Sequence, residues 1–427
     1  MPGKFSGESG SLHIVLDTHI WRTGRSIFPP QMAGQSRWDF QSHAASKRGP
    51  KPKDTNPIQA AIRSWLKALP EELVESLGLN IERSLLDAPK RWVVYPPMAL
   101  LPSGSFRVDL EQEGIGKKHK DALWKEILDG IGKKEGKGVL THLAINSGIP
   151  PSKSEDEREN ILRTPSGLIM LYGDFGPDLP PDHPPSQQDL EEAFWVSTKQ
   201  NGITQVWAPR YTMFSRGNVK EKARLLDFHG SGQALESRKV DKEELRKQVA
   251  VDLYAGIGYF VFSYVKMGMG NVVGWELNPW SIEGLRRGAV ANGWTVKVVR
   301  EGEEWEEGIQ EMVVFQEDNQ QAVERLKAMQ MGLLGIVSHV NGGLLPTSEA
   351  SWKVSLEVLE GSGWLHLHDN VGVKDVERRK EGIEEIFKGW LKEKDDKRQA
   401  KIEHVEFVKT FAPGVWHCVF DVYINNH

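Results

Sequence analysis

The sequence predicts an α/β protein in which a mostly parallel sheet with an antiparallel last strand follows a smaller N-terminal α+β domain. Beyond residue 245, short apolar runs alternate with amphipathic helical runs, which is the pattern of a parallel sheet. The last two apolar runs are separated only by residues 412–415, whereas a parallel crossover needs about a dozen residues. These two runs are therefore expected to pair antiparallel. The length of 427 residues allows two or three domains.

The N-terminal part divides into an extension and a compact domain. Residues 1–55 are punctuated by Gly, Ser and Pro and have no sustained hydrophobic period, so we expect a flexible extension. Apolar residues then recur at helical spacing over 56–69, and a second helical segment begins at Pro70 and ends near Asn80. Residues 90–185 combine short β-like runs with a helical stretch. The β-like runs are 92–95, 138–143 and 167–171, the helical stretch is 117–130, and a proline-rich linker follows at 177–185.

The C-terminal part carries the regular alternation of strands and helices. The predicted strands are 249–255, 272–277, 313–316, 334–340, 364–368, 405–411 and 416–424, and the predicted helices are 259–267, 280–292, 349–359 and 373–391. This arrangement is typical of class I S-adenosylmethionine-dependent methyltransferases, which have a Rossmann-like fold. The sequence thus predicts a flexible extension over 1–55, a helical and α+β domain over 56–185, and an S-adenosylmethionine-binding catalytic domain over 186–427.

Composition and charge exclude several other classes of protein. With 39% hydrophobic and 26% charged residues the chain has globular proportions, and no apolar run reaches the roughly 18 residues of a membrane span. The single cysteine, Cys418, excludes an internal disulfide framework and a cysteine-based metal site. The net charge of −5 argues against a general polyanion binder, so nucleic-acid contact would depend on local basic patches. We expect a cytoplasmic monomer without membrane contact.

A glycine turn after the first strand of the sheet predicts a nucleoside site. Gly256 and Gly258 let the backbone approach a ligand closely, and Glu276 ends the next strand, where a carboxylate can accept bonds from both ribose hydroxyls. Val261 replaces the third glycine of a dinucleotide-binding turn, and Asp252 would repel a pyrophosphate and attract an ammonium. These features favour S-adenosylmethionine over NAD, although a plain tight turn explains the two glycines equally well.

Two further polar segments follow later strands of the sheet. Asp318 and Asn319 close the third strand, where they can accept a bond from an adenine amino group. Asn341 to Pro346, with the sequence NGGLLP, closes the fourth strand, where this fold keeps substrate-facing residues. A simple strand-to-helix turn is the alternative for this second segment.

A basic and aromatic stretch over residues 201–224 is the candidate surface for nucleic acid. Basic side chains interleaved with aromatic ones suit phosphate neutralisation together with base stacking. The alternative is a helix that begins at Ser215 or Asn218 and exposes its positive residues to water. The basic groups at 117–120 and 133–137 are more typical of solvated faces. The basic residues of the stretch are Arg210, Arg216, Lys220, Lys222 and Arg224, and the aromatic ones are Trp207, Tyr211 and Phe214.

The most specific segment of the chain is MFSRGN (213–218), which a Glu-Lys pair follows. It belongs to a larger set of segments, which are FWVSTKQNGITQVWAPRYTMFSRGNVKEKAR (194–224), VDLYAGIGYF (251–260), GWELNP (274–279), QEDN (316–319), VNGGLLPTSE (340–349) and KTFAPGVWHCVFDVYI (409–424), with PKRWVVYPPMALLPSGSF (89–106) and THLAINSGIP (141–150) upstream. Together they resemble the tRNA wybutosine-synthesising protein 2 family, in particular its fungal members, from about residue 56 to the end.

The resemblance implies an unusual use of S-adenosylmethionine. Its 3-amino-3-carboxypropyl group, not its methyl group, would be transferred to C7 of 4-demethylwyosine, the base on the 3′ side of the anticodon in phenylalanine tRNA, with release of methylthioadenosine. Asn341 and Pro346 would be the catalytic residues. The expected cofactor contacts are Ser215, Lys222, Asp252, Gly256, Gly258, Glu276, Asn278, Asp318 and Asn319, and the expected tRNA contacts are Arg210, Arg216 and Lys220. We expect no metal site, and the acidic insertion at 301–311 is expected to be a solvated loop.

The chain departs from the family pattern Arg-Val-Asn-Leu-Gly-Leu at two positions. His339 stands in place of the arginine, and Gly342 stands in place of the first leucine. Relatives that methylate guanine at the same tRNA position carry a shorter Asn-Leu-Pro segment. Two other functions therefore stay open, a tRNA guanine-N1 methyltransferase, which would release S-adenosylhomocysteine, and a non-catalytic tRNA-binding protein. The spacing singles out no side chain as a general base.

Overall fold

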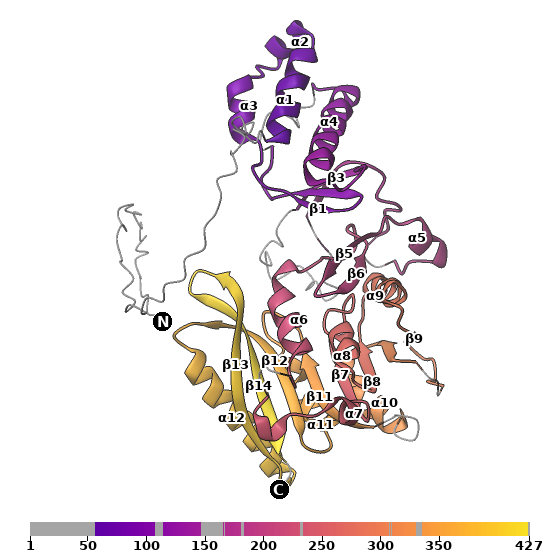
Figure 1. The fold of residues 1–427 in the computed structure, drawn as a ribbon, viewed down its shortest axis with the longest axis vertical. Coiled ribbons are helices and arrows are strands. Elements are labelled where there is room, and N and C mark those ends of the chain that lie inside the picture. Colours follow the sequence, from indigo (N-terminus) through magenta and orange to yellow (C-terminus); the bar gives the residue numbers. More distant parts are fainter. Residues whose placement is uncertain are drawn as a thin grey trace, which may run out of the picture. The chain divides into compact units, whose positions relative to one another are not determined.

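A computed structural model describes residues 56–106, 114–146, 165, 167–180, 183–230, 234–306, 308, 310–329 and 335–425 (Figure 1). The expected extension over 1–55 lies outside these residues, as does Leu334, the predicted first residue of the fourth strand. Within the described ranges, every helix is too short or too polar to span a bilayer.

The described residues before position 173 contain a small four-stranded sheet and four helices (Figure 1). The strand order is β1-β2-β3-β4, and only β2 and β3 run parallel. The first helix begins at Pro57 because the Asn56 side chain accepts a bond from the Ile58 amide. The elements are α1 (Pro57–Ala68), α2 (Glu71–Ser76), α3 (Ile81–Asp87), β1 (Val93–Tyr95), β2 (Met98–Leu101), α4 (Lys117–Glu135), β3 (His142–Asn146) and β4 (Leu168–Tyr172).

The structure differs from the sequence prediction at three places in this part. The helical unit does not end at Asn80, because the Asn80 side chain accepts a bond from the Arg83 amide and caps a third helix, α3. Strand β2 was not predicted, since its four residues are too short a run to show a period. Strand β3 begins at His142 instead of Gly138.

A second segment connects the small sheet to the large one. It contains a β-hairpin that the sequence analysis missed, with Asn201 and Gly202 at the turn, both at positive φ (52° and 72°), which is the backbone of a two-residue hairpin turn. The elements are α5 (Gln187–Glu192), β5 (Val196–Gln200), β6 (Ile203–Trp207), the short 3₁₀ turn η1 (Arg216–Asn218), α6 (Val219–Leu226), η2 (Glu236–Arg238) and α7 (Lys242–Leu245).

The large sheet has eight strands in the order β13-β14-β12-β11-β7-β8-β10-β9. The six strands β7 to β12 pair parallel, and β14 pairs antiparallel with both of its neighbours, so the predicted fold class is confirmed. Strand β9, at the edge, was not predicted. The strands are β7 (Gln248–Asp252), β8 (Asn271–Trp275), β9 (Val296–Arg300), β10 (Met312–Gln316), β11 (Ile336–Gly342), β12 (Gly363–Gly372), β13 (Gln399–Ala412) and β14 (Val415–Asn425).

Helices cover both faces of this sheet. On one face, α10, α11 and α12 pack around Trp275, Trp352 and Phe387. On the other, α6, α8 and α9 pack around Phe228, Phe262 and Leu285. The helices and turns are α8 (Val261–Met267), α9 (Pro279–Asn292), η3 (Asn319–Gln321), α10 (Ala322–Met329), η4 (Glu349–Ser351), α11 (Trp352–Val358) and α12 (Val376–Glu393). The carboxyl ends of the parallel strands therefore form one edge, where ligands bind in folds of this kind.

Candidate functional site

The glycine turn lies at the carboxyl end of β7, the central strand, and leads into α8. Gly256 and Gly258 both have positive φ, 54° and 86°, a backbone that side chains with a Cβ rarely adopt. A Cβ at Gly258 would also approach the Phe262 ring to 2.5 Å. The two glycines are thus required by the turn itself, which brings backbone amides to the strand edge.

Glu276 follows the end of β8, next to this turn. Its Oε2 accepts a bond from the Gly256 amide at 2.8 Å, and its Oε1 accepts one from the Asn278 amide at 2.8 Å. Burial raises the pKa of Glu276 to about 7, against the opposing effect of these two amides. Each oxygen keeps a second lone pair, so the carboxylate can hold the loop and still accept from two hydroxyl groups.

Asp252, the last residue of β7, is fully buried and contacts the neighbouring strand β11. Its Oδ1 accepts from the Asn341 side-chain amide at 3.0 Å and from the Tyr254 backbone amide at 3.1 Å, while its Oδ2 has no hydrogen-bond partner among the described residues. Burial raises the pKa of Asp252 to about 6. The structure thus brings Asp252 and Asn341 together and leaves one buried acceptor atom unused.

The other predicted cofactor residues at this edge have local structural roles. Asn278 caps α9 by accepting a bond from the Trp280 amide. The exposed Asp318 caps η3 by accepting from Gln320, and the side-chain amide of Asn319 donates to the Leu253 carbonyl at 2.9 Å. These bonds fix the strand ends, and they leave the Asp318 carboxylate open to solvent.

The two departures from the family pattern have structural reasons. A Cβ at Gly342 would come within 3.2 Å of Ser348 Oγ, so a leucine would displace this hydroxyl, which bonds the His368 carbonyl. His339 does not face the glycine turn. Its Nδ1 lies 3.0 Å from His366 Nε2 and its Nε2 lies 2.9 Å from His229 Nε2, within a buried chain of histidines.

This histidine chain ends on a carboxylate, which fixes its hydrogen bonds. His366 Nδ1 lies 2.7 Å from Asp421 Oδ1. Because burial lowers the pKa of both His229, to about 4, and His339, each ring is neutral and has one N–H. An ionised Asp421 can only accept, so His366 Nδ1 carries a hydrogen and donates it to this carboxylate. Among the described residues, no group of three or more His, Cys, Asp or Glu side chains is arranged to hold a metal.

Arg224 joins the same carboxylate to helix α6. Its guanidinium donates to Asp421 at 2.5 and 3.1 Å and to Glu221 at 2.6 and 2.8 Å, and all three side chains are buried. Burial alone would raise the pKa of Asp421, but the Arg224 guanidinium holds it well below its usual range. Ionic bonds between Arg224 and Asp421 therefore hold helix α6 against β14. They also set the position of the other residues of α6.

Lys222, on the same helix, is a buried cation. It is 3% exposed, and its Nζ donates to the side-chain carbonyl oxygens of Gln200 and Gln205, both at 2.7 Å, and lies over the Phe214 and Tyr259 rings. Burial lowers the pKa of Lys222 to about 8, and no acidic side chain among the described residues forms an ion pair with it. A solvated helix face is therefore wrong for Lys222, and its charge lacks a counter-ion.

Several curated proteins are similar to most of this chain, whereas no family model matches it. The tRNA wybutosine-synthesizing protein 2 of Schizosaccharomyces pombe is 40% identical over 374 residues, which cover 87% of this chain and 81% of that protein. The protein of the same name from Saccharomyces cerevisiae is 33% identical over 378 residues, or 79% and 75% of the two chains. The chain belongs to the tRNA wybutosine-synthesizing protein 2 family.

Solved structures of this and a second family share the fold. A TYW2 from Pyrococcus horikoshii in complex with MeSAdo aligns with a TM-score of 0.51 at 20% identity, covering 86% of this chain and all of that one. Trm5b from Pyrococcus abyssi aligns with a TM-score of 0.50 at 14% identity, covering 82% and 79%.

The basic residues that the sequence suggests for tRNA differ in how they are held in this family member. Arg216 is exposed on η1. Arg210 forms an ion pair with Asp178 at 2.9 Å, and Lys220, 62% exposed, forms one with Glu406 at 2.6 Å. The structure therefore leaves Arg216 and Lys220 accessible to a phosphate, while Arg210 is only partly exposed.

Sequence analysis missed a group of polar residues at the far end of the same edge. Ser215 Oγ accepts from Lys409 Nζ at 3.3 Å, and Lys409 lies opposite His417 in the β13–β14 pair. His417 in turn lies opposite Asn370 of β12. The available signal was the polar residue at every second position of β12, His366, His368 and Asn370, in a strand that has helices on both faces.

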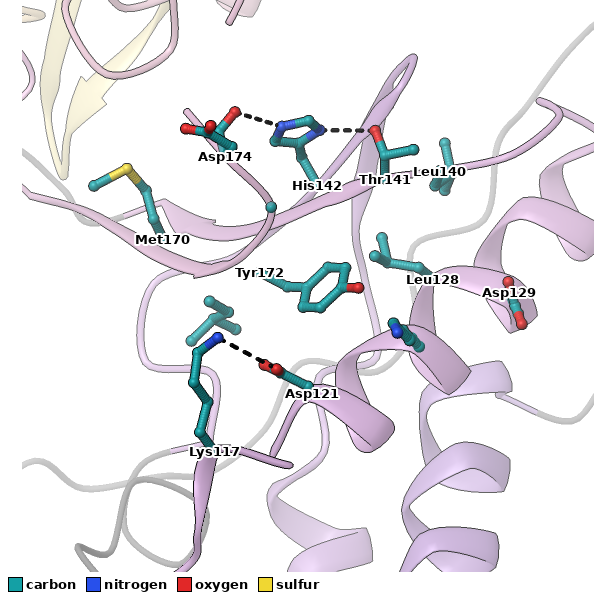
Figure 2. A pocket seen from close by; sticks show the side chains of 13 residues that line it. Lys117, Asp121, Leu128, Asp129, Leu140, Thr141, His142, Met170, Tyr172 and Asp174 are labelled. Carbon is teal, nitrogen blue, oxygen red and sulfur yellow. Dashed lines mark hydrogen bonds and ion pairs between the residues drawn. The ribbon is translucent and has the colours of Figure 1, made fainter. Parts of the chain in front are cut away.

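A cavity of about 730 Å³ lies in the small sheet, between α4 and strands β3 and β4 (Figure 2). Lys117 pairs with Asp121 at 3.5 Å, and Lys125 lies over the Tyr172 ring. The two ring nitrogens of His142 are hydrogen-bonded to Thr141 Oγ1 and to the Asp174 carbonyl oxygen, each at 2.8 Å. These polar groups bind one another, in contrast to the atoms without partners at the edge of the large sheet.

Proposed function

We propose that this protein transfers the 3-amino-3-carboxypropyl group of S-adenosylmethionine to C7 of 4-demethylwyosine in phenylalanine tRNA and releases methylthioadenosine. The observation that carries the proposal is the 40% identity to the S. pombe tRNA wybutosine-synthesizing protein 2 over 87% of the chain. The solved TYW2 structure with MeSAdo, a name for methylthioadenosine, has the same fold. S-Adenosylmethionine is accordingly the co-substrate.

The residues at the strand edge fit an S-adenosyl nucleoside. Glu276 has free lone pairs for two ribose hydroxyls, and Asp318 is open to an adenine amino group. The unpartnered Asp252 Oδ2 is a buried acceptor beside the glycine turn, suited to an ammonium or to an N–H donor. Lys222, a buried cation with no acidic partner among the described residues, suits the carboxylate of the aminocarboxypropyl group together with Ser215.

The sulfonium of the co-substrate makes all three attached carbons electrophilic, so orientation decides which group is transferred. In this chain Lys222 and Ser215 would draw the carboxylate away from the glycine turn, toward α6. Asn341, held by its bond to Asp252, and Pro346 would then face the γ-carbon, where C7 attacks. The new C7–Cγ bond forms as the Cγ–S bond breaks onto sulfur, and the C7 proton leaves to solvent or a nearby base.

Incubation with carboxyl-labelled S-adenosylmethionine and tRNA that contains 4-demethylwyosine tests this proposal. We expect label in the RNA and stoichiometric methylthioadenosine by chromatography. S-Adenosylhomocysteine as the sole product, formed from the same tRNA with guanosine at the target position, would establish the guanine-N1 methyltransferase instead. Neither product, with tRNA binding intact, would establish a non-catalytic binding protein.

Several finer features belong to the same proposal. We propose that the protein acts as a cytoplasmic monomer and that its parts are an extension (1–55), a helical and α+β domain (56–185) and a catalytic domain (186–427). Arg210, Arg216 and Lys220 are the proposed tRNA contacts. Sedimentation at micromolar concentration that gives a dimer would contradict the monomer.

A further inference from the structure

Strand β12 and the strand beside it present a cluster of buried polar atoms without partners. These atoms are the side-chain nitrogen and oxygen of Asn370, Nε2 of His368 and Nδ1 of His417. Among the described residues, Asn370 is the only side chain with two such atoms. Buried polar groups in folded proteins almost always have hydrogen-bond partners. Four unpartnered atoms on three neighbouring residues therefore indicate a place where a ligand binds.

These residues are neighbours in the sheet and lie on one face of it. Asn370 lies directly opposite His417 in the β12–β14 pair, and His368 is two residues before Asn370, so its side chain points to the same face. His368 Nδ1 and His417 Nε2 are 2.9 Å apart. The Phe260 ring, at the start of α8, packs edge-on against His368 with centroids 5.1 Å apart, which places the cluster on the face of the glycine turn.

The cluster also adjoins the predicted catalytic segment. The Asn370 backbone N–H donates to the Pro346 carbonyl at 2.8 Å, and the backbone carbonyl of His368 accepts from Ser348. Asn341 pairs with His366 in the sheet, so Asn370 is four residues, or about 13 Å, further along β12 toward the carboxyl edge. Lys409 and Ser215 lie on its other side.

Strand order then assigns the cluster to the acceptor side of the reaction. Across β10, β8 and β7 lie the residues proposed for adenine, ribose and the reacting centre. Strands β11 and β12 follow with Asn341 and Asn370, so the next group along the edge is the one that receives the transferred carbon. This step rests on the proposed function.

The hydrogen-bonding character of the cluster suits the edge of a heteroaromatic base. In either tautomer of the pair, one histidine donates to the other, and the two outer nitrogens are left as one N–H donor and one bare acceptor. Asn370 adds one amide donor group and one carbonyl acceptor. A phosphate would be met by donors alone, whereas a purine-derived ring with an N–H and a carbonyl needs both kinds.

We propose that Asn370, His368 and His417 read the hydrogen-bonding edge of the tricyclic target base and hold its C7 toward the transferred group. The four atoms are closed to solvent in this structure, so the base contacts them directly only when the side chains that cover them move aside. The adjacent Lys409 is available to a flanking phosphate. Burial lowers the pKa of His368 and of His417, the latter to about 4, so both rings are neutral at physiological pH and keep this donor and acceptor pattern.

The test uses Asn370→Leu, which removes both unpartnered amide atoms in a side chain of similar size. We expect kcat/KM for tRNA containing 4-demethylwyosine to fall by about tenfold or more, as for the loss of two hydrogen bonds. The Kd of methylthioadenosine should stay within twofold, and Tm should not fall, because an unsatisfied polar group is replaced by an apolar one. Asn370→Ala gives the same comparison if leucine does not fit.

Ser84→Ala is the matched control, since Ser84 also has a buried side-chain oxygen without a partner but lies on α3 of the small domain. It should leave both Tm and kcat/KM within error of wild type or raise Tm slightly. A second comparison uses the same tRNA with guanosine at the target position. Wild type should bind the tricyclic form more tightly, and Asn370→Leu should lose this preference while its affinity for the guanosine form is unchanged.

The outcomes separate this inference from the function on which it rests. No label transfer by wild type would refute the function. Label transfer by wild type together with unchanged kcat/KM in both Asn370 variants would overturn the assignment of the cluster. Weaker binding of methylthioadenosine in parallel with lost activity would also overturn it, because the cluster would then serve the nucleoside and not the base.

Discussion

Lowering the pH from 8 to 6 is expected to weaken the binding of methylthioadenosine about tenfold through the titration of Glu276. The carboxylate bonds the Gly256 and Asn278 amides and is proposed to accept from both ribose hydroxyls. Its pKa in the free protein is about 7, raised chiefly by burial. Methylthioadenosine is the better probe, because it lacks the amino group of S-adenosylmethionine, which would titrate in the same range.

The magnitude follows from the ionised fraction of Glu276. With a pKa of about 7, roughly nine tenths of the free protein is ionised at pH 8 and roughly one tenth at pH 6. Hydroxyl donors stabilise the carboxylate, so the pKa in the complex is lower than in the free protein, and binding strengthens as the pH rises through 7. The ratio of ionised fractions gives the tenfold change in Kd.

Calorimetry at pH 6, 7 and 8 measures this change, and two variants assign it. The Glu276→Gln protein should bind methylthioadenosine weakly at every pH, because the NH₂ group of the new side chain would face one of the two backbone N–H donors. Its Kd should not depend on pH, because the new side chain does not titrate. Asp252→Asn should keep most of the dependence, since Asp252, with a pKa of about 6, changes its ionised fraction only about twofold between pH 6 and 8. A wild-type Kd that changes less than twofold, or a Glu276→Gln protein that keeps the tenfold change, would refute the reasoning.

Four further outcomes are expected. Glu276→Ala should weaken methylthioadenosine binding at least tenfold and Asp318→Ala less, by calorimetry, because the exposed Asp318 offers one solvent-screened contact. Lys222→Met should weaken S-adenosylmethionine about tenfold but not methylthioadenosine, which has no carboxylate; equal effects on both ligands would contradict this role. Lys220→Ala should lower the salt slope of tRNA binding by about 1, and an unchanged slope would make it an ordinary surface lysine. Asp421→Asn should cost about 3–5 kcal/mol in urea unfolding, because it leaves buried Arg224 short of a partner; a loss below 1 kcal/mol would contradict that.

Regular patterns were enough to predict the large sheet. The strand β7, the glycine turn and α8 follow from a short apolar run, two glycines and a helical period, all of them local. The antiparallel β13–β14 pair followed from the length of one connection. The short strands β2, β5, β6 and β9 were not predicted, because four or five residues at a sheet edge or in a hairpin have too few buried positions to show a period.

The candidate cofactor residues could be predicted wherever a strand end placed them, as for Asp252, Glu276 and Asn341. Burial could not be predicted in the same way. Lys222 and Lys220 are two positions apart in one basic stretch, yet one is buried between Gln200 and Gln205 and the other pairs with Glu406 on the surface. The difference depends on which side of α6 faces the sheet, and this is set by the Arg224 network with a strand almost 200 residues away.

The same limit applies within β12 and explains why its residues separate only in the structure. His366, His368 and Asn370 form one polar row in the sequence, and a period of two states only that they share a face. His366 meets Asp421, 55 positions later in the chain, and becomes part of a closed, structural hydrogen-bond chain. His368 is hydrogen-bonded to His417 through one nitrogen of each ring, and the other nitrogen of each ring has no partner among the described residues. The Asn370 side chain likewise has no hydrogen-bond partner there. The number of side-chain atoms without a hydrogen-bond partner thus increases along β12 toward the carboxyl edge, where the reaction is proposed to occur. This increase distinguishes the residues that stabilise the fold from those that can bind a substrate.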